Sequence, residues 1–136
     1  YSNQRYATSL VRLSYKDVTT HEHYAENHFI DLKLYYFLEL NHDASRPLTV
    51  WGAGHKGKTV AKTLVAKKIP FYWICDNPKK INKHIYDQKL REFKYLERLQ
   101  NPQSIITVAN AQAQTDIKTY LHKQDMKAME DYFFFC

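Results

Sequence analysis

Glycine and cysteine are both scarce in this chain, which has three glycines and two cysteines among 136 residues. Cys75 and Cys136 form neither a disulfide framework nor a metal-binding spacing, which favours a reducing compartment. No apolar stretch approaches the ~18 residues of a membrane-spanning helix, and no signal-peptide pattern is present. These absences argue against a disulfide-stapled scaffold and a membrane span, and predict a cytoplasmic domain.

Concentrated charge is also missing, although the formal net charge is +6. The lysines are scattered along the chain, and there is no arginine-rich block and no nucleic-acid-binding motif. The pattern predicts a solvated basic face rather than a surface for DNA or RNA. A small ligand that carries phosphate would still be attracted by this charge.

All three glycines lie in one stretch with the spacing G-x-G-x-x-G. Residues 48–51 before it predict a strand and residues 59–66 after it predict a helix. Backbone N–H groups and the positive end of the helix dipole would converge at the bend between them, which is an anion site. Glycine is needed there where φ is positive or where a phosphate approaches bare backbone. The expected ligand-binding residues of this stretch are Gly52, Ala53, Gly54, His55, Lys56, Gly57 and Lys58.

The same stretch matches two motifs. A dinucleotide-binding loop requires an acidic residue about 20 positions further on, and Asp76 supplies it at the end of the apolar run 70–75. A Walker A loop would instead use Lys58 for phosphates and Thr59 for Mg²⁺. The short remaining chain, and the lack of a candidate that positions an attacking water, disfavour the Walker A interpretation. A glycine turn without a ligand is a third possibility.

The chain divides at Pro47 into two predicted parts. Residues 1–46 are expected to form an extended arm and a long helix from about Thr20 to Asn41, opened by a Thr-x-x-Glu capping box. The broad apolar stripe of this helix predicts that another part of the protein covers it. Because the chain opens at Tyr1 rather than at methionine, we expect a piece of a longer protein, with residues 1–46 the tail of an upstream domain.

Residues 47–136 are expected to form a small three-layer α/β domain of Rossmann-like fold. Predicted strands at 48–51, 70–75, 104–109 and within 126–135 alternate with helices, which indicates a mostly parallel four-stranded sheet of order 2-1-3-4. In such sheets a ligand binds at the carboxyl ends of the strands, where the order reverses. This places the glycine stretch, Asp76 with Asn77, and Ala109 with Asn110 around one crevice.

Three segments together carry a resemblance to a known module: residues 50–58, 74–80 and 105–110. The set resembles the Rossmann-like module that opens bacterial sugar O-acyltransferases of the sialic-acid and pilin-glycan type. With Trp51 and the aromatic C-terminal tail, it is most similar to a domain behind family 2 glycosyltransferases of Bacteroidetes-type bacteria, and residues 1–10 are similar to the segment after their catalytic core.

The resemblance implies a nucleotide or UDP-type nucleotide-sugar as ligand and an upstream glycosyltransferase domain as partner. Related modules have glycines in the crossing after the second strand, where this chain has Asn82 and Asp87, which tolerate left-handed backbone. The chain contains no D-x-D motif, so the metal and diphosphate chemistry of such a transferase is not expected within these residues.

Single residues leave alternatives open. Asp76 either accepts a hydrogen bond from a ribose or base, or only forms a turn, and Lys56 and Lys58 either steer phosphate or are solvated. Zinc binding by the histidines at 21, 23 and 28 is disfavoured because i and i+2 do not share a helix face. Cys75 is expected in the core. No complete catalytic set is found.

The sequence therefore predicts a non-catalytic, accessory nucleotide-binding domain with no metal site. An NAD-dependent oxidoreductase or epimerase domain is one alternative, and it would need a Tyr-Lys pair that no motif places. A docking or homodimerisation module that uses the aromatic end 132–135 is the other.

Overall fold

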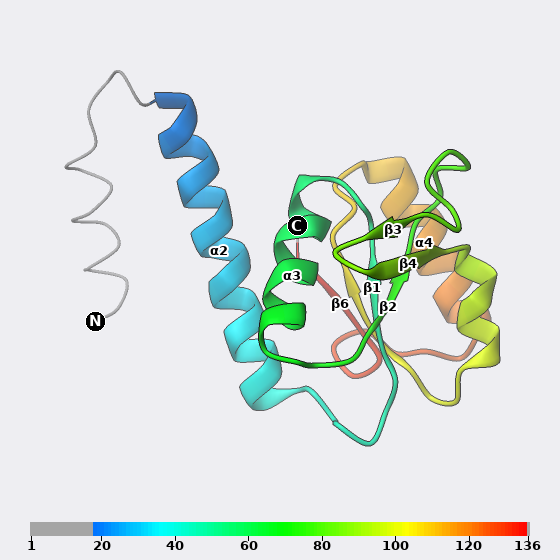
Figure 1. The fold of residues 1–136 in the computed structure, drawn as a ribbon. Helices are drawn as coiled ribbons and strands as arrows, with labels where there is room; N and C mark the ends of the chain where they lie inside the picture. The colour runs from blue at the N-terminus through cyan, green and yellow to red at the C-terminus, as the bar shows by residue number, and fades with distance from the viewer. Residues whose placement is uncertain (1–17, 136) are drawn as a thin grey trace.

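The computed structural model describes residues 18–135 and shows an α/β fold with a mostly parallel six-stranded sheet (Figure 1). The order is β3-β4-β2-β1-β5-β6, and only the β3–β4 pair is antiparallel. The strands are β1 (Leu48–Trp51), β2 (Tyr72–Ile74), β3 (His84–Ile85), β4 (Gln88–Arg91), β5 (Gln103–Ile106) and β6 (Tyr132–Phe134). The predicted arm and residues 1–10 lie outside the described residues.

The prediction of a four-stranded sheet was wrong in its number of strands. The strands β2, β1, β5 and β6 do lie side by side in this order, but a hairpin, β3–β4, extends the sheet beyond β2. Tyr86 and Asp87 turn this hairpin with φ of 52° and 61°, and Asn82 has φ of 70°. Asn82 and Asp87 thus adopt the left-handed backbone expected of them, which lets the chain enter and turn the β3–β4 hairpin.

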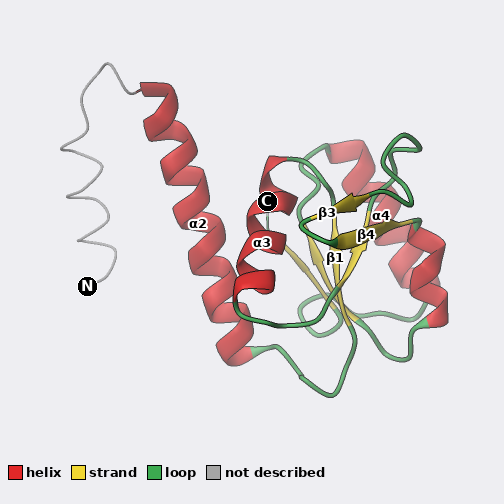
Figure 2. Cartoon of the chain, viewed as in Figure 1, coloured by secondary structure: helices red, strands yellow, loops and turns green. Residues whose placement is uncertain are grey.

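Helices cover both faces of the sheet (Figure 2). Val50, Trp73 and Ile105 point to the face under α2 (Val18–Leu40) and α3 (His55–Ala66). Their neighbours Trp51, Ile74 and Ile106 point to the face under the 3₁₀ helix η2 (Phe93–Arg98) and α4 (Ala111–Lys123). Because successive side chains of a strand alternate between faces, both faces of the central strands are buried, as is typical of parallel sheets.

The long helix α2 lies beside α3, and its C-terminal half joins the core (Figure 1). Ile30, Leu34 and Phe37 are buried, and the ring of Phe37 is 4.9 Å from that of Phe133 on β6. The α/β domain therefore covers one side of the apolar stripe. Other large apolar side chains of the helix stay exposed, among them Phe29 and Leu40, which are 67% and 76% exposed.

The start of one helix differs from the prediction for a clear local reason. Helix α4 begins at Ala111 rather than near Thr115, because the Asn110 side chain accepts a hydrogen bond of 2.9 Å from the Ala113 N–H and caps it. The last strand, β6, has three residues and lies within the predicted stretch 126–135. Within residues 18–135 no helix combines the length and hydropathy that crossing a bilayer needs.

Candidate functional site

The bend between β1 and α3 is held by two glycines that the fold itself requires. Gly52 has φ of 110°, and a Cβ there would lie 2.5 Å from the Thr107 hydroxyl oxygen. A Cβ on Gly57 would collide with the carbonyl oxygen of Gly52, so α3 crosses directly over the end of β1. These two glycines therefore serve the turn and the close packing of helix on strand.

Gly54 is different because nothing in the fold around it requires a glycine. Its φ of −83° and ψ of −163° suit any residue, and a Cβ would have no neighbour within 4 Å. Gly54 is exposed at the N-cap of the 12-residue helix α3. The N–H groups of a helix's first turn have no intrahelical acceptor, so bare backbone and the positive end of the dipole meet at this open position.

The start of α3 also bears on the Walker A interpretation. The helix begins at His55, so Gly57 and Lys58 already belong to it, and the Lys58 N–H donates to the Gly54 carbonyl at 2.9 Å. A Walker A motif needs a longer loop whose N–H groups surround the phosphates before the helix starts. The bend here is too short for that arrangement.

The end of β2 is tied to the glycine loop, which we define as Gly52–Gly57. The Trp73 indole N–H donates to the Gly52 carbonyl at 2.7 Å, and the Lys80 ammonium donates to the Ala53 carbonyl at 3.3 Å. Lys80 thus brings a positive charge to the loop from the turn after β2.

Asp76 and Asn77 are both exposed past the end of β2, but they differ in use. The Asn77 side chain accepts a hydrogen bond of 3.0 Å from the Lys79 N–H and so stabilises the turn. Asp76 lines the pocket described below.

Cys75, which precedes Asp76, is buried, as the sequence predicted. Burial raises the pKa of its thiol, so the thiol stays protonated.

The end of β5 forms the other side of the crevice. Thr107 donates to the Trp51 carbonyl through both its N–H, at 2.9 Å, and its hydroxyl, at 2.6 Å. Ala109 and Asn110 follow it and are exposed, and the Asn110 side chain is engaged in capping α4. The carboxyl ends of β1, β2 and β5 therefore meet at one edge, as the sequence predicted.

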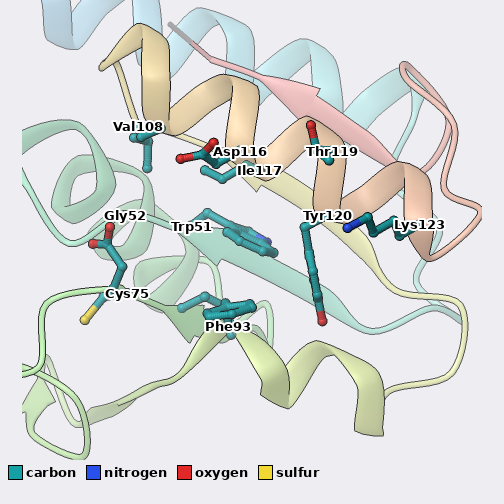
Figure 3. Close-up of a pocket in the computed structure, with 13 residues that line it drawn as sticks. Trp51, Gly52, Cys75, Phe93, Val108, Asp116, Ile117, Thr119, Tyr120 and Lys123 are labelled. Carbon is teal, nitrogen blue, oxygen red and sulfur yellow. The ribbon is translucent and has the colours of Figure 1, made fainter.

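A pocket of about 420 Å³ opens between η2 and α4, on the face of the sheet opposite α3 (Figure 3). We call it the η2–α4 pocket. Its apolar lining includes Trp51, Ile74, Phe93, Val108, Ala113, Ile117 and Tyr120. Its polar lining includes Asp76, Asp116, Thr119 and Lys123. Of the sequence-predicted site residues, Gly52 and Asp76 line this pocket. Residues 55–58 belong to α3 on the other face of the sheet, and Ala53, Gly54, Asn77, Ala109 and Asn110 lie outside the lining.

The sequence missed the aromatic wall of this pocket. Trp51 directly precedes Gly52, and because side chains alternate along a strand it lies on the face opposite Val50. This alternation is the sequence signal that could have placed Trp51 at the pocket. Phe93 and Tyr120 come from η2 and α4, and nothing in their spacing along the chain relates them to Trp51. Their rings lie 5.1 Å apart, edge to face.

Tyr120 is fixed in its neutral form. Burial and a hydrogen bond of 2.7 Å to the Glu97 carboxylate raise its pKa well above the ordinary range of tyrosine. A tyrosine that serves a dehydrogenase as general base needs the opposite shift. The raised pKa and the bond to Glu97 therefore count against Tyr120 and the neighbouring Lys123 on α4 as a catalytic Tyr-Lys pair.

Searches of family models, curated proteins and solved structures found no match to this chain. Among the described residues no group of three or more His, Cys, Asp or Glu side chains is arranged to hold a metal ion. The side chains at 21–23 lie outside the described ones.

Proposed function

We propose that this chain is an accessory domain of Rossmann-like type that binds a nucleotide or nucleotide-sugar, with the diphosphate at the glycine loop. The observation that carries the proposal is Gly54. It is exposed at the N-cap of α3, and neither its backbone angles nor its neighbours require a glycine. An incoming phosphate that contacts bare backbone is a physical reason for glycine at this position.

Charge and shape support the same assignment. Lys56 and Lys58 lie in the first turns of α3, and Lys80 reaches the loop from the turn after β2. Positive charge therefore gathers around the N-terminus of the helix. The η2–α4 pocket begins at Gly52, beside the loop, and its volume lies within the range of small-molecule sites. The three glycines match the three roles of a dinucleotide-binding loop: Gly52 forms the turn, Gly54 leaves room for phosphate, and Gly57 allows the helix to pack on the strand.

The parent protein, on this proposal, is a cytoplasmic bacterial glycosyltransferase whose catalytic domain lies upstream of residues 1–46. The basis is the resemblance described above, carried by Trp51, the aromatic C-terminal tail and residues 1–10 together with the three module segments. The domain would hold the donor nucleotide-sugar or a related nucleotide, and the metal-dependent step would take place in the upstream domain.

A docking or dimerisation module is the second candidate. The aromatic end 132–135 was expected to serve it, but Tyr132, Phe133 and Phe135 are buried in the core, so the exposed side of α2 is the surface that favours it. Phe29, Tyr36 and Leu40 are 67%, 52% and 76% exposed at near-heptad spacing on this helix. A nucleotide domain and a docking helix are compatible, so the two candidates are separated by whether the crevice binds ligand.

Thermal shift with NAD, NADP, UDP, UDP-sugars, CoA and Mg-ATP tests the proposal. A ligand at 100 times its Kd adds about 2.7 kcal/mol of stability, which corresponds to several degrees for a domain of this size. We expect UDP or a UDP-sugar to raise the Tm, and we expect Gly54→Ala to abolish the shift. Because Gly54 has open space, the variant should itself remain folded. Absence of a shift with every ligand would refute nucleotide binding.

A further inference from the structure

The aromatic rings that line the η2–α4 pocket present their carbon faces to a ligand, because their polar atoms are hydrogen-bonded within the protein. The Trp51 indole N–H donates to the Thr49 hydroxyl at 3.2 Å, and the Tyr120 hydroxyl donates to Glu97 at 2.7 Å. Both polar atoms are therefore satisfied inside the protein, and the hydrogen bonds fix the two rings, whose centroids lie 6.2 Å apart. Trp51 is only 5% exposed, so most of the ring surface that a ligand meets comes from the partly buried Phe93 and Tyr120, which suit a flat aromatic ring.

The walls complete a slot around Trp51. In Figure 3 the Trp51 ring lies between Phe93 of η2 and Ile117 of α4, with Tyr120 beside it. The second tryptophan, Trp73, is buried in the core on the opposite face of the sheet. Both tryptophans are buried, at 5% and 1% exposure, but Trp51 is the one whose remaining surface lines this pocket.

The charges of the pocket differ from those of the glycine loop. Asp76 and Asp116 contribute carboxylates to the lining, and the Asp116 carboxylate accepts a hydrogen bond of 3.0 Å from Gln112. Lys123, the cation of the lining, lies seven residues beyond Asp116 on α4, which is about 10 Å along the helix axis. Carboxylates repel phosphate but accept hydrogen bonds from ribose hydroxyls and base N–H groups.

We propose that the η2–α4 pocket binds the nucleoside end of the ligand, with the base against Trp51 and with Asp76 and Asp116 accepting its hydrogen bonds. This rests on the proposed function, in which the diphosphate binds at Gly54. Gly52 belongs to both the loop and the pocket lining, so the two ends of one ligand meet there. A volume of about 420 Å³ accommodates a base and its ribose.

Tryptophan fluorescence titrations test this assignment with uridine, adenosine, UDP, ADP and pyrophosphate as separate probes. We expect a nucleoside without phosphate to quench Trp51 emission. Ala113→Phe fills the pocket and should weaken the binding of both nucleosides and nucleoside diphosphates at least tenfold. Ala111→Phe, an exposed position on the same helix turn outside the lining, is the control and should change neither.

A milder pair of variants covers the case in which Ala113→Phe does not fold. Asp116→Asn should lower nucleoside affinity severalfold and leave pyrophosphate unchanged, whereas Asp125→Asn, exposed and outside the pocket, should have no effect. Gly54→Ala should weaken pyrophosphate and the diphosphates but leave nucleoside binding intact.

The outcomes separate this inference from the proposed function. Nucleoside diphosphate binding that is lost in Gly54→Ala but unaffected by Ala113→Phe and Asp116→Asn would overturn the nucleoside site and keep the function. A second outcome is that only the pocket variants lose nucleoside binding and that Gly54→Ala leaves pyrophosphate binding unchanged. This outcome would support the nucleoside site and overturn the diphosphate assignment. No response to any probe would overturn both.

Discussion

A methyl group added at the three glycines would meet three different surroundings. At Gly57 it would strike the Gly52 carbonyl, at Gly52 it would press on Thr107 from a backbone with φ of 110°, and at Gly54 it would enter open space. Backbone atoms cannot move aside as a flexible side chain can, so the first collision must separate α3 from β1. One motif therefore combines residues with structural roles and a residue free for binding.

Gly57→Ala should accordingly destabilise the fold by about 2 kcal/mol or more, because overpacking against backbone cannot be relieved locally. Gly54→Ala should change the free energy of unfolding by less than about 1 kcal/mol, since a small loss of N-capping is offset by lower entropy of the unfolded chain. Urea denaturation followed by circular dichroism measures both. Equal losses in the two variants would contradict the division of roles.

Tyr120 makes stability depend on alkaline pH. Its folded-state pKa lies above the unfolded value of about 10, because burial and Glu97 favour the neutral phenol. The unfolded chain therefore loses this proton first, so the stabilisation is complete below about pH 10 and declines as the pH rises above it. We expect the stability difference between wild type and Tyr120→Phe to shrink between pH 9 and pH 11. A difference that stays constant over urea titrations in that interval would show that Tyr120 is not responsible.

At the scale of elements, the connection between α2 and β1 is pinned by the buried Gln103 of β5. Its amide donates to the Asn41 carbonyl at 2.9 Å and to the Glu130 carbonyl at 3.2 Å, and accepts from the Asp43 N–H at 2.8 Å. Arg46 adds a 2.6 Å ion pair with Asp131. The segment that the sequence presents as a polar linker is thus held against the ends of β5 and β6.

Gln103→Leu should destabilise the fold by about 2–3 kcal/mol, because three backbone groups lose their partner while the side chain stays buried. Gln100→Leu is the matched control at an exposed position of the preceding turn, and its effect should stay within about 0.5 kcal/mol. Hydrogen exchange should increase first at residues 41–46. Protection there that equals wild type would show that Gln103 does not hold the connection.

At the scale of the whole molecule, α2 and the sheet share one core. Leu34 and Ile30 pack in the same cluster as Val60, Leu64 and Phe133. The helix has little reason to be stable alone, because the packing of an apolar face supplies most helical stability in proteins. The C-terminal half of α2 is therefore expected to unfold together with the α/β domain.

Leu34→Ala should destabilise the entire fold by about 2–5 kcal/mol, since Leu34 is 1% exposed. Leu40→Ala on the same helix, at 76% exposure, should change it by less than about 0.5 kcal/mol. Helical circular dichroism and Trp73 fluorescence should report one coincident transition in both proteins. Two separate transitions, with only the helical signal sensitive to Leu34→Ala, would indicate that α2 folds independently of the sheet.

The sequence by itself determined the local elements and the edge at which they meet. Apolar runs ending at Trp51, Cys75 and Ala109, with glycine, Asp76 and Asn110 after them, predict parallel strands whose carboxyl ends share one rim. The left-handed turn residues Asn82 and Asp87 were also readable, because backbone tolerance is a property of single residue types.

Only the tertiary structure decided which glycines the fold requires, how many strands the sheet has and where the pocket opens. Gly52, Gly54 and Gly57 look alike in the sequence and differ only in what lies across from them. Trp51, Phe93 and Tyr120 become one wall because η2 and α4 cover the same face of the sheet. Such contacts join residues far apart in the chain, and their positions follow from the packing of whole elements rather than from any local pattern.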